Sequence, residues 1–275
     1  MSGTLYLVAT PIGNLGDFSP RAAATLESAD FIAGEDTRVS MKLLNHLGLR
    51  KQLVSYHQHN RAAAGPQILE RLLAGESCAL VTDAGTPAIS DPGEDLVRLC
   101  AENGVTVQSI PGCCALISAL AVSALPTGRF TFEGFLSVNK KERREHLQSL
   151  AAEERTMIFY EAPHRLRATL SDLLEAFGDR PAALCRELTK LHEETRRTTL
   201  AQAAAYCQEN DLRGEDVRVI AGREPVKEGA GSLEEGVRLV LERREAGERM
   251  KDAVRQVAAA TGLSRNALYD AALKA

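Results

Sequence analysis

Residues 78–104 read CALVTDAGTPAISDPGEDLVRLCAENG, and this stretch decides how the first half of the chain folds. An apolar run, Cys78–Val81, precedes a loop, 83–93, that holds two Asp, two Pro and two Gly, and a helical pattern then ends at Gly104. Each Pro fixes φ and removes an N–H group, so the loop is too stiff for a linker, and it is too polar for a core. The order of strand, rigid loop and helix predicts one unit of an α/β sheet, with the loop at the carboxyl end of a strand.

The same alternation runs through the first 126 residues. Strand patterns cover 4–10, 30–36, 52–57, 78–83 and 105–112, and helical patterns cover 19–29, 40–49, 64–76, 93–104 and 114–125. Ser19 is a predicted N-cap, with Pro20 at the first helical position. Strands that alternate with helices predict an N-terminal α/β domain, 1–126, with a largely parallel sheet.

A second α/β domain is predicted over residues 127–223. Its strand patterns cover 129–136, 156–162, 182–189 and 215–222, and its helical patterns cover 140–154, 164–178 and 199–210. Residues 224–232 then turn to Gly, Pro and charge, which is typical of a linker. The tail, 233–275, is helical throughout, and its helix, Gly-containing turn and helix predict a small helix-turn-helix domain.

The composition excludes several classes of protein. The 275 residues are 44% hydrophobic with a net charge of −4, which is typical of a soluble globular protein and does not indicate a nucleic-acid binder by charge alone. The apolar run 115–125 is too short to span a bilayer, and the N-terminus has no basic segment of a signal peptide. Six Cys without a CxxC spacing indicate free thiols, so we expect a cytoplasmic protein. His57 and His59 favour a polar surface over a metal site, and no metal is expected.

Polar loops follow six of the predicted strands. They are Thr10–Asp17, Glu35–Arg38, Asp83–Gly93, Pro111–Cys114, Glu161–Arg165 and Arg186–Lys190. Because α/β sheets bind ligands at the carboxyl ends of strands, these loops predict one large cleft. The chain has neither a dinucleotide fingerprint nor a Walker A motif. A stiff loop with exposed backbone groups, such as 84–93, suits a neutral or zwitterionic adenosyl ligand better than a polyphosphate.

Seven motifs carry a resemblance to a known family. In order they are LYLVATPIGNLGD, GEDTR, VTDAGTPAISDPG, IPGCCALISALAVSALPT, FEGFL, FYEAPHR and RELTKLHEE, and the match that they mark covers about residues 4–222. With this order and spacing the chain resembles the ribosomal RNA small subunit methyltransferase I family of the tetrapyrrole-methylase superfamily. The resemblance implies two α/β domains with S-adenosylmethionine in the cleft between them, and a homodimer. It also implies 2′-O-methylation of a cytidine ribose in 16S ribosomal RNA, with the small ribosomal subunit or its RNA as partner.

The sequence departs from the family pattern at three places. Cys113-Cys114-Ala115 stands where the family usually has Pro-Ser-Ala, and Arg197-Thr198-Thr199-Leu200 where it has Arg-Gly-Thr-Leu. Asp216 stands where an aromatic residue is usual. A thiol remains a weak donor, so we expect the Cys114 change to alter cofactor affinity without abolishing binding. We expect Asp216 to affect local packing and not the chemistry.

The resemblance and the strand-end loops together give candidate site residues. The expected cofactor contacts are Pro11, Asp83, Gly85, Thr86, Ile89, Cys114, Ala115 and Tyr160. The candidates that face the cleft and could remove the hydroxyl proton are Asp36, Glu187 and Lys190. The expected RNA contacts are Arg38, Lys140, Lys141, Arg143, Arg144, His164, Arg165 and Arg186.

Two other functions stay open at this point. One is a methyltransferase that acts on a tetrapyrrole-like small molecule, and the other is a non-catalytic ribosome-binding factor with the same fold. The motifs and the helical tail favour the ribosomal RNA enzyme. The tail itself is expected either to contact the phosphate backbone of RNA or to serve as a packing appendage or dimer brace.

Overall fold

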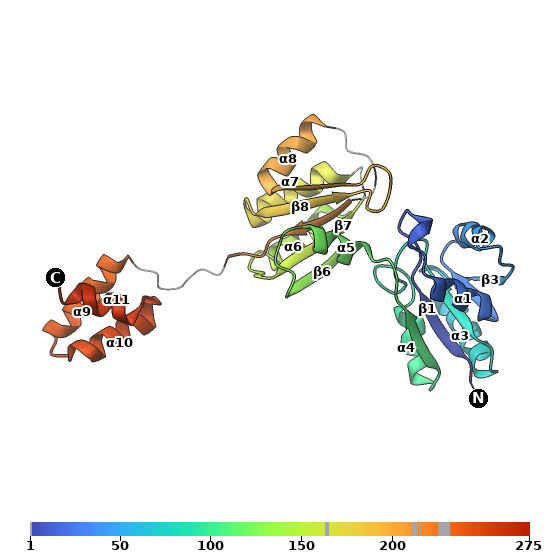
Figure 1. The fold of residues 1–275 in the computed structure, drawn as a ribbon, viewed down its shortest axis with the longest axis horizontal. Coiled ribbons are helices and arrows are strands. Elements are labelled where there is room, and N and C mark those ends of the chain that lie inside the picture. The colour runs from blue at the N-terminus through green and yellow to red at the C-terminus, as the bar shows by residue number, and fades with distance from the viewer. Residues whose placement is uncertain (1, 163–164, 211–213, 215, 225–231) are drawn as a thin grey trace. The chain divides into compact units, whose positions relative to one another are not determined.

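The computed structural model describes residues 2–162, 165–210, 214, 216–224 and 232–275. The chain forms two compact units, 1–223 and 224–275. The first unit contains two five-stranded sheets, and the second contains only helices among the residues described (Figure 1). The α/β class and the small C-terminal helical domain are therefore confirmed, while the boundary at residue 126 stays a prediction.

The first sheet is entirely parallel, as the alternation predicted. It contains β1 (Thr4–Val8), β2 (Phe31–Gly34), β3 (Gln52–Ser55), β4 (Cys78–Val81) and β5 (Thr106–Ile110), in the order β3-β2-β4-β1-β5. Both β2 and β4 are buried along their whole length, because helices cover both faces of the sheet. All five carboxyl ends meet at one edge, where the polar loops lie.

The helices of this half follow the predicted pattern with shifted starts. They are α1 (Pro20–Ser28), α2 (Thr37–His46), α3 (Arg61–Leu73) and α4 (Glu94–Glu102), with a short 3₁₀ turn, η1 (Leu15–Asp17). The Ser19 hydroxyl accepts the Ala22 N–H and caps α1 as expected. The carboxylate of Asp36 caps α2, so this helix begins three residues earlier than predicted.

Helix α5 (Ala115–Val122) follows the first sheet in the chain but packs on the second sheet. Its Leu116, Ala119 and Leu120 lie in one apolar cluster with residues of β7 and β10. Figure 1 shows α5 beside the strands of this sheet. Most of the large apolar side chains of this helix are thus buried within the first unit. Ile117, at 49% exposure, still faces outward.

The second sheet is mixed and contains a strand that was not predicted. It consists of β6 (Phe130–Phe135), β7 (Thr156–Glu161), β8 (Pro181–Arg186), β9 (Glu194–Thr199) and β10 (Asp216–Ile220), in the order β6-β7-β10-β8-β9. Only β6 and β7 are parallel, and the other pairs are antiparallel. The sequence of β9, ETRRTT, lacks an apolar face because β9 is a half-exposed edge strand, where charged side chains are usual.

Three further helices cover the opposite face of this sheet from α5. They are α6 (Lys140–Ser149), α7 (Leu166–Phe177) and α8 (Leu200–Glu209), and they enclose a core that includes Leu147, Leu170 and Phe159. A buried ion pair joins α6 to α7, because Arg143 Nη2 lies 2.7 Å from Asp172 Oδ2. Arg143, which the sequence analysis placed among the RNA contacts, is therefore part of the buried structure.

The C-terminal unit has a core of its own. Helices α9 (Leu233–Glu245), α10 (Met250–Thr261) and α11 (Arg265–Ala272) bury Val240, Val254, Val257 and Leu268. Gly262, with φ at +67°, ends α10, and Ser264 caps α11, as the helix-turn-helix pattern predicted. Within the described parts of the chain, every helix is too short or too polar to cross a membrane.

Candidate functional site

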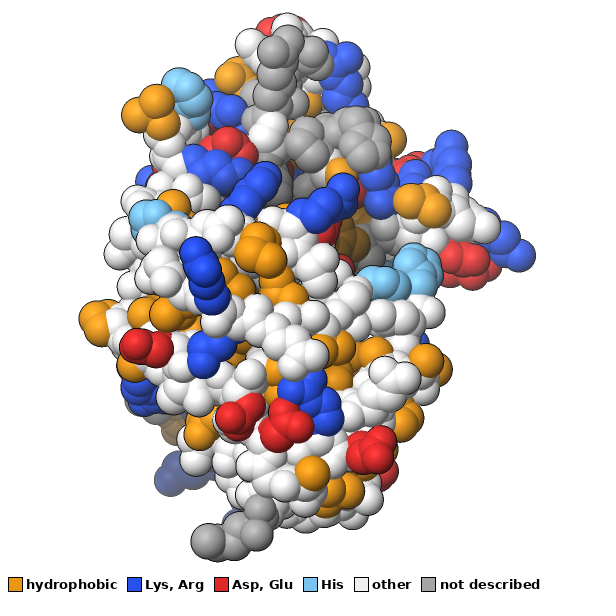
Figure 2. All heavy atoms as spheres, turned by 90° about the vertical axis from the view of Figure 1, so that its right-hand side faces the viewer, with side chains coloured by type: hydrophobic (Ala, Val, Ile, Leu, Met, Phe, Trp, Pro, Cys, Tyr) orange, Lys and Arg blue, Asp and Glu red, His pale blue; other side chains and the backbone are white. Residues whose placement is uncertain are grey.

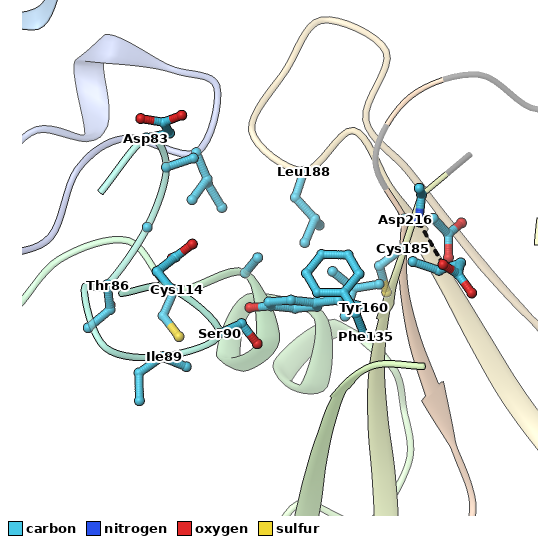
Figure 3. Close-up of a pocket in the computed structure, with 18 of the residues that line it drawn as sticks. Asp83, Thr86, Ile89, Ser90, Cys114, Phe135, Tyr160, Cys185, Leu188 and Asp216 are labelled. Carbon is cyan, nitrogen blue, oxygen red and sulfur yellow. Dashed lines mark hydrogen bonds between the residues drawn. The ribbon is translucent and has the colours of Figure 1, made fainter. Parts of the chain in front are cut away.

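A cavity of about 510 Å³ lies where strand ends of the two sheets face each other. One wall comes from the loops after β2, β4 and β5, and the other from the ends of β7, β8 and β10. Figure 3 shows Thr86, Ile89 and Ser90 on the loop side, Leu188 above and the ring of Tyr160 between them. The six strand-end loops therefore border one partly open pocket of ligand size.

The loop 83–93 is fixed to its neighbours by hydrogen bonds. The Thr10 N–H donates to the Gly85 carbonyl at 2.8 Å, and the Gly85 N–H donates back at 3.1 Å. The Thr86 hydroxyl donates to the Cys113 carbonyl at 3.0 Å. These bonds join the loops after β1, β4 and β5 into one rigid wall.

Backbone strain is concentrated in the same loop. Ala88 and Ser90 have φ values of +68° and +63°, which cost roughly 1–3 kcal/mol each in a non-glycine residue. Gly93 closes the loop at φ +149°, and a Cβ there would lie 3.0 Å from Ala88 Cβ and from Leu80 Cδ2. Strain of this kind persists only where the surroundings hold it, and it is typical of ligand-binding loops.

Three carboxylates line the loop side of the cavity: Glu35, Asp83 and Asp91. The Thr82 hydroxyl donates to Glu35 Oε2 at 3.3 Å and also hydrogen-bonds the Asp91 side chain. Burial raises the pKa of Asp91 to about 6, and burial together with Asp83 raises the pKa of Glu35. Within the described ranges neither Glu35 nor Asp91 forms an ion pair, so this wall favours a cationic ligand.

The opposite wall is aromatic and apolar around Tyr160, and it also carries Glu161 and Asp216. Tyr160 accepts the Leu116 N–H at 3.0 Å, which uses one of the first amides of α5. Its ring meets Phe132 and Phe135 edge to face, with centroids 4.9 and 5.4 Å apart. Burial raises the pKa of Tyr160, so the phenol stays neutral. This wall offers a flat apolar surface beside the acidic one.

The structure brings most of the predicted cofactor residues to this cavity. Those that line it are Asp83, Gly85, Thr86, Ile89, Cys114, Ala115 and Tyr160. Pro11 lines a second, smaller cavity next to it. Glu35 and Asp91 were missed as site residues, although both stand in strand-end loops that the sequence had marked. Contact of any of them with a cofactor stays a prediction.

The predicted catalytic residues lie apart from the main cavity. Asp36 caps α2 and pairs with Arg38 at 2.5 Å, and the hydrogen bond from Arg38 lowers the pKa of Asp36 to about 2. A carboxylate of such low pKa is a weak base. Lys190 Nζ lies 2.9 Å from Glu187 Oε1, and Lys190 lines the second cavity.

The predicted RNA contacts divide into two groups. Arg38, Lys140 and Lys141 have exposed side chains. Arg143 is buried against Asp172, and the others form the ion pairs Arg144–Glu175, Arg165–Glu161 and Arg186–Glu194. Figure 2 shows Lys and Arg side chains bordering a hollow in the upper half of one face of the first unit. His164 lies outside the described residues, and those described contain no cluster of His, Cys, Asp and Glu that could hold a metal.

Comparisons with known proteins identify the family. A model described as Tetrapyrrole (Corrin/Porphyrin) Methylases matches residues 4–204, and one described as RsmI C-terminal HTH domain matches 233–275. A Synechocystis protein named ribosomal RNA small subunit methyltransferase I is 52% identical over 274 residues, which cover 99% of this chain and 98% of that protein. The chain belongs to the ribosomal RNA small subunit methyltransferase I family. A Pseudomonas aeruginosa member of this family is 45% identical, with 99% and 98% covered.

Solved structures of other tetrapyrrole methylases share the fold of this family member. Cobalt precorrin-4 methyltransferase is 18% identical with a TM-score of 0.59. The superposed region covers 79% of this chain and 94% of that chain. The uroporphyrin-III C-methyltransferase of Thermus thermophilus, solved with S-adenyl homocysteine, is 19% identical with a TM-score of 0.57, and covers 80% and 97%. At such low identity the likeness concerns the fold alone.

Proposed function

We propose that this protein transfers a methyl group from S-adenosylmethionine to the 2′-hydroxyl of a cytidine ribose in 16S ribosomal RNA. The observation that carries the proposal is the cavity of about 510 Å³, whose rigid loop 83–93 holds the motif of the ribosomal RNA small subunit methyltransferase I family. The near full-length relatives with this name support the RNA substrate over a tetrapyrrole. The low identity to the corrin and porphyrin enzymes gives no support to the small-molecule alternative.

The residues of the cavity fit S-adenosylmethionine. Its sulfonium and ammonium charges match the carboxylates of Glu35, Asp83 and Asp91, and its adenosyl group matches the apolar wall at Tyr160. When bound, it supplies a methyl group that is already activated by the positive sulfur. The loop 83–93 would hold the ligand through backbone groups in a fixed shape.

The protein then has two tasks. It must hold the ribose hydroxyl beside the cavity, and positioning alone contributes about 7–11 kcal/mol in favourable systems. It must also accept the hydroxyl proton, for which a positioned base contributes roughly 10²–10⁴ in rate. Asp36 is poorly matched to this task, because the hydrogen bond from Arg38 lowers its pKa to about 2.

Binding of the cofactor is testable by calorimetry. Thr86→Trp fills the loop side of the cavity and Pro87→Trp adds bulk at the next position of the same loop, so each should abolish binding of S-adenosylmethionine while circular dichroism stays unchanged. Leu73→Trp, on an exposed end of α3, is the control and should bind normally. Unchanged affinity in both cavity variants would overturn the cofactor assignment. Mass mapping of ribosomal RNA from cells with and without the protein tests the methylated position.

We infer that the enzyme works on the small ribosomal subunit or its RNA in the cytoplasm. The exposed Arg38, Lys140 and Lys141 would meet phosphates. The C-terminal unit would add Lys251 and Arg255 on α10 and Arg265 on α11. A chain that ends at Arg223 should keep cofactor affinity but methylate subunits slowly, with partial recovery at low salt. Equal rates of the short and full chains at all salt concentrations would leave the C-terminal unit without a substrate role.

We also infer a homodimer. Ile117 and Val122 of α5 remain 49% and 36% exposed on a helix that buries Leu116, Ala119 and Leu120, and such exposed apolar side chains suit a subunit contact. Light scattering at micromolar concentration should give twice the chain mass of 29.7 kDa. A monomer under these conditions would contradict the dimer.

A further inference from the structure

A second cavity of about 350 Å³ adjoins the proposed cofactor cavity, and nothing in the proposed function yet uses it. It lies between the turn after β1, one face of α2, and the loop after β8. It shares Ile12, Asp83 and Ala84 with the first cavity. These three shared residues form a wall between the two cavities. Only this wall separates a ligand in the second cavity from the first cavity.

The wall is held rigidly. The paired hydrogen bonds between Thr10 and Gly85 run through it, and Asp83 Oδ1 accepts the Asp36 N–H at 3.1 Å. The start of α2 thus fixes the Asp83 side chain at the boundary of both cavities. A group placed against Asp83 from the second cavity lies at the mouth of the first.

The second cavity has a different chemical character from the first. Leu15, which is 48% exposed, and Val39 and Leu43 give it an apolar surface, while Lys42 and Lys190 are cations on its lining. The lining of the first cavity instead carries five carboxylates and no lysine; the carboxylates are Glu35, Asp83, Asp91, Glu161 and Asp216. The first therefore suits a cation, and the second suits a ligand with one apolar ring and one anionic group.

Lys190 reaches this cavity from the second sheet. A Cβ on Gly13 would lie 2.5 Å from Lys190 Cγ, so the lysine stem packs directly on the Gly13 backbone. Glu187 and Thr189, at φ +51° and +67°, form the strained turn that carries Lys190 there. The pair Glu187–Lys190 thus closes the second cavity.

We propose that the second cavity receives the target nucleotide, with the base against Leu15, Val39 and Leu43, a phosphate near Lys42, and the ribose hydroxyl facing the wall at Asp83. The volume suits a single nucleotide. A nucleotide can enter such a cavity only from a single strand or after leaving its stack. This assignment rests on the proposed function, because the cytidine is named there and the cavity itself indicates only a nucleotide.

Val39→Phe tests the proposal, since Val39 lines the second cavity and not the first. We expect affinity for S-adenosylhomocysteine to stay within twofold and kcat/KM on small ribosomal subunits to fall at least tenfold. Met41→Phe adds similar bulk on the same helix outside both cavities, and it should methylate normally. Leu15→Trp, at an exposed turn, repeats the test if Val39→Phe does not fold.

Direct binding gives an independent readout. Cytidine 5′-monophosphate should bind the protein saturated with S-adenosylhomocysteine, as seen by saturation-transfer NMR, and Val39→Phe should remove this signal. Failure of the nucleotide to bind the wild type, wild-type turnover in Val39→Phe and Leu15→Trp, or a matching loss of S-adenosylhomocysteine affinity would each overturn the subsite. If the nucleotide binds as expected but no ribosomal RNA is methylated, the proposed function fails and the subsite stands.

Discussion

The two sheets of the first unit bury acidic side chains in opposite ways. At the first sheet, Glu35 and Asp91 face a cavity, and no ion pair to them is found in the part of the chain that the structure describes. At the second sheet, Glu161 of β7 and Asp216 of β10 also line this cavity, but they lie beside the fully buried Arg218, whose nitrogens are 3.8 Å and 3.5 Å from their oxygens. The first arrangement leaves negative charge for a ligand to neutralise, and the second neutralises it within the fold.

Removing the cation from the second arrangement should have the largest effect. Arg218→Met leaves Glu161 and Asp216 buried without this partner, so we expect a loss of about 3–5 kcal/mol in the free energy of unfolding. Urea denaturation followed by circular dichroism measures this. The double variant Arg218→Leu with Asp216→Leu removes both charges and should recover much of the loss. A single variant as stable as the wild type would show that the pair is not needed.

Removing the Asp91 carboxylate at the first sheet should instead raise the free energy of unfolding. The pKa of Asp91 is raised from 3.8 to about 6 in the folded state, so ionisation of Asp91 destabilises the fold. This penalty is absent below about pH 4 and complete above about pH 6. Asp91→Asn should therefore raise unfolding stability by about 1–2 kcal/mol at pH 8 and leave it unchanged near pH 4. Thermal melts at the two pH values check this, and an equal gain at both would contradict it.

The same carboxylates should distinguish charged from neutral ligands. With Glu35→Gln and Asp91→Asn combined, we expect affinity for S-adenosylmethionine to fall about tenfold, equivalent to about 1.4 kcal/mol, relative to S-adenosylhomocysteine. The reason is that only the former carries a positive sulfur. Competition calorimetry gives the ratio, and Asp36→Asn is the control because Asp36 lines neither cavity. An unchanged ratio would mean that these acids do not face the sulfonium.

The exposed lysines should have the smallest effect on stability. Lys140→Ala and Lys141→Ala remove charges at the surface of α6, so the free energy of unfolding should change by less than about 0.5 kcal/mol. Binding to small ribosomal subunits should weaken a few-fold, most clearly at low salt. A stability loss comparable with that of Arg218→Met would place these lysines in the fold instead.

The sequence predicted most of what depends on local patterns. The five parallel strands follow from alternating strand and helix patterns, and Ser19 with Pro20 marks the start of α1. Strand β9 was missed because an edge strand needs no apolar face. The cavity loops were found by composition, but the pairing of Arg143 was not, since Asp172 is 29 residues away and only tertiary packing joins them. Glu35 was missed for the same reason, because its hydrogen bond with Thr82 joins residues 47 apart in the sequence.

The packing of α5 bears on how this fold could be divided or recombined. A fragment that begins at residue 127 would contain every strand of the second sheet but would leave Ile158, Val217 and Val219 without the helix that covers them. A fragment that ends at residue 126 would carry α5 with no surface on which to pack. Exchange of halves between relatives therefore preserves this contact only when the cut falls before Ala115, ahead of the last helix of the first half.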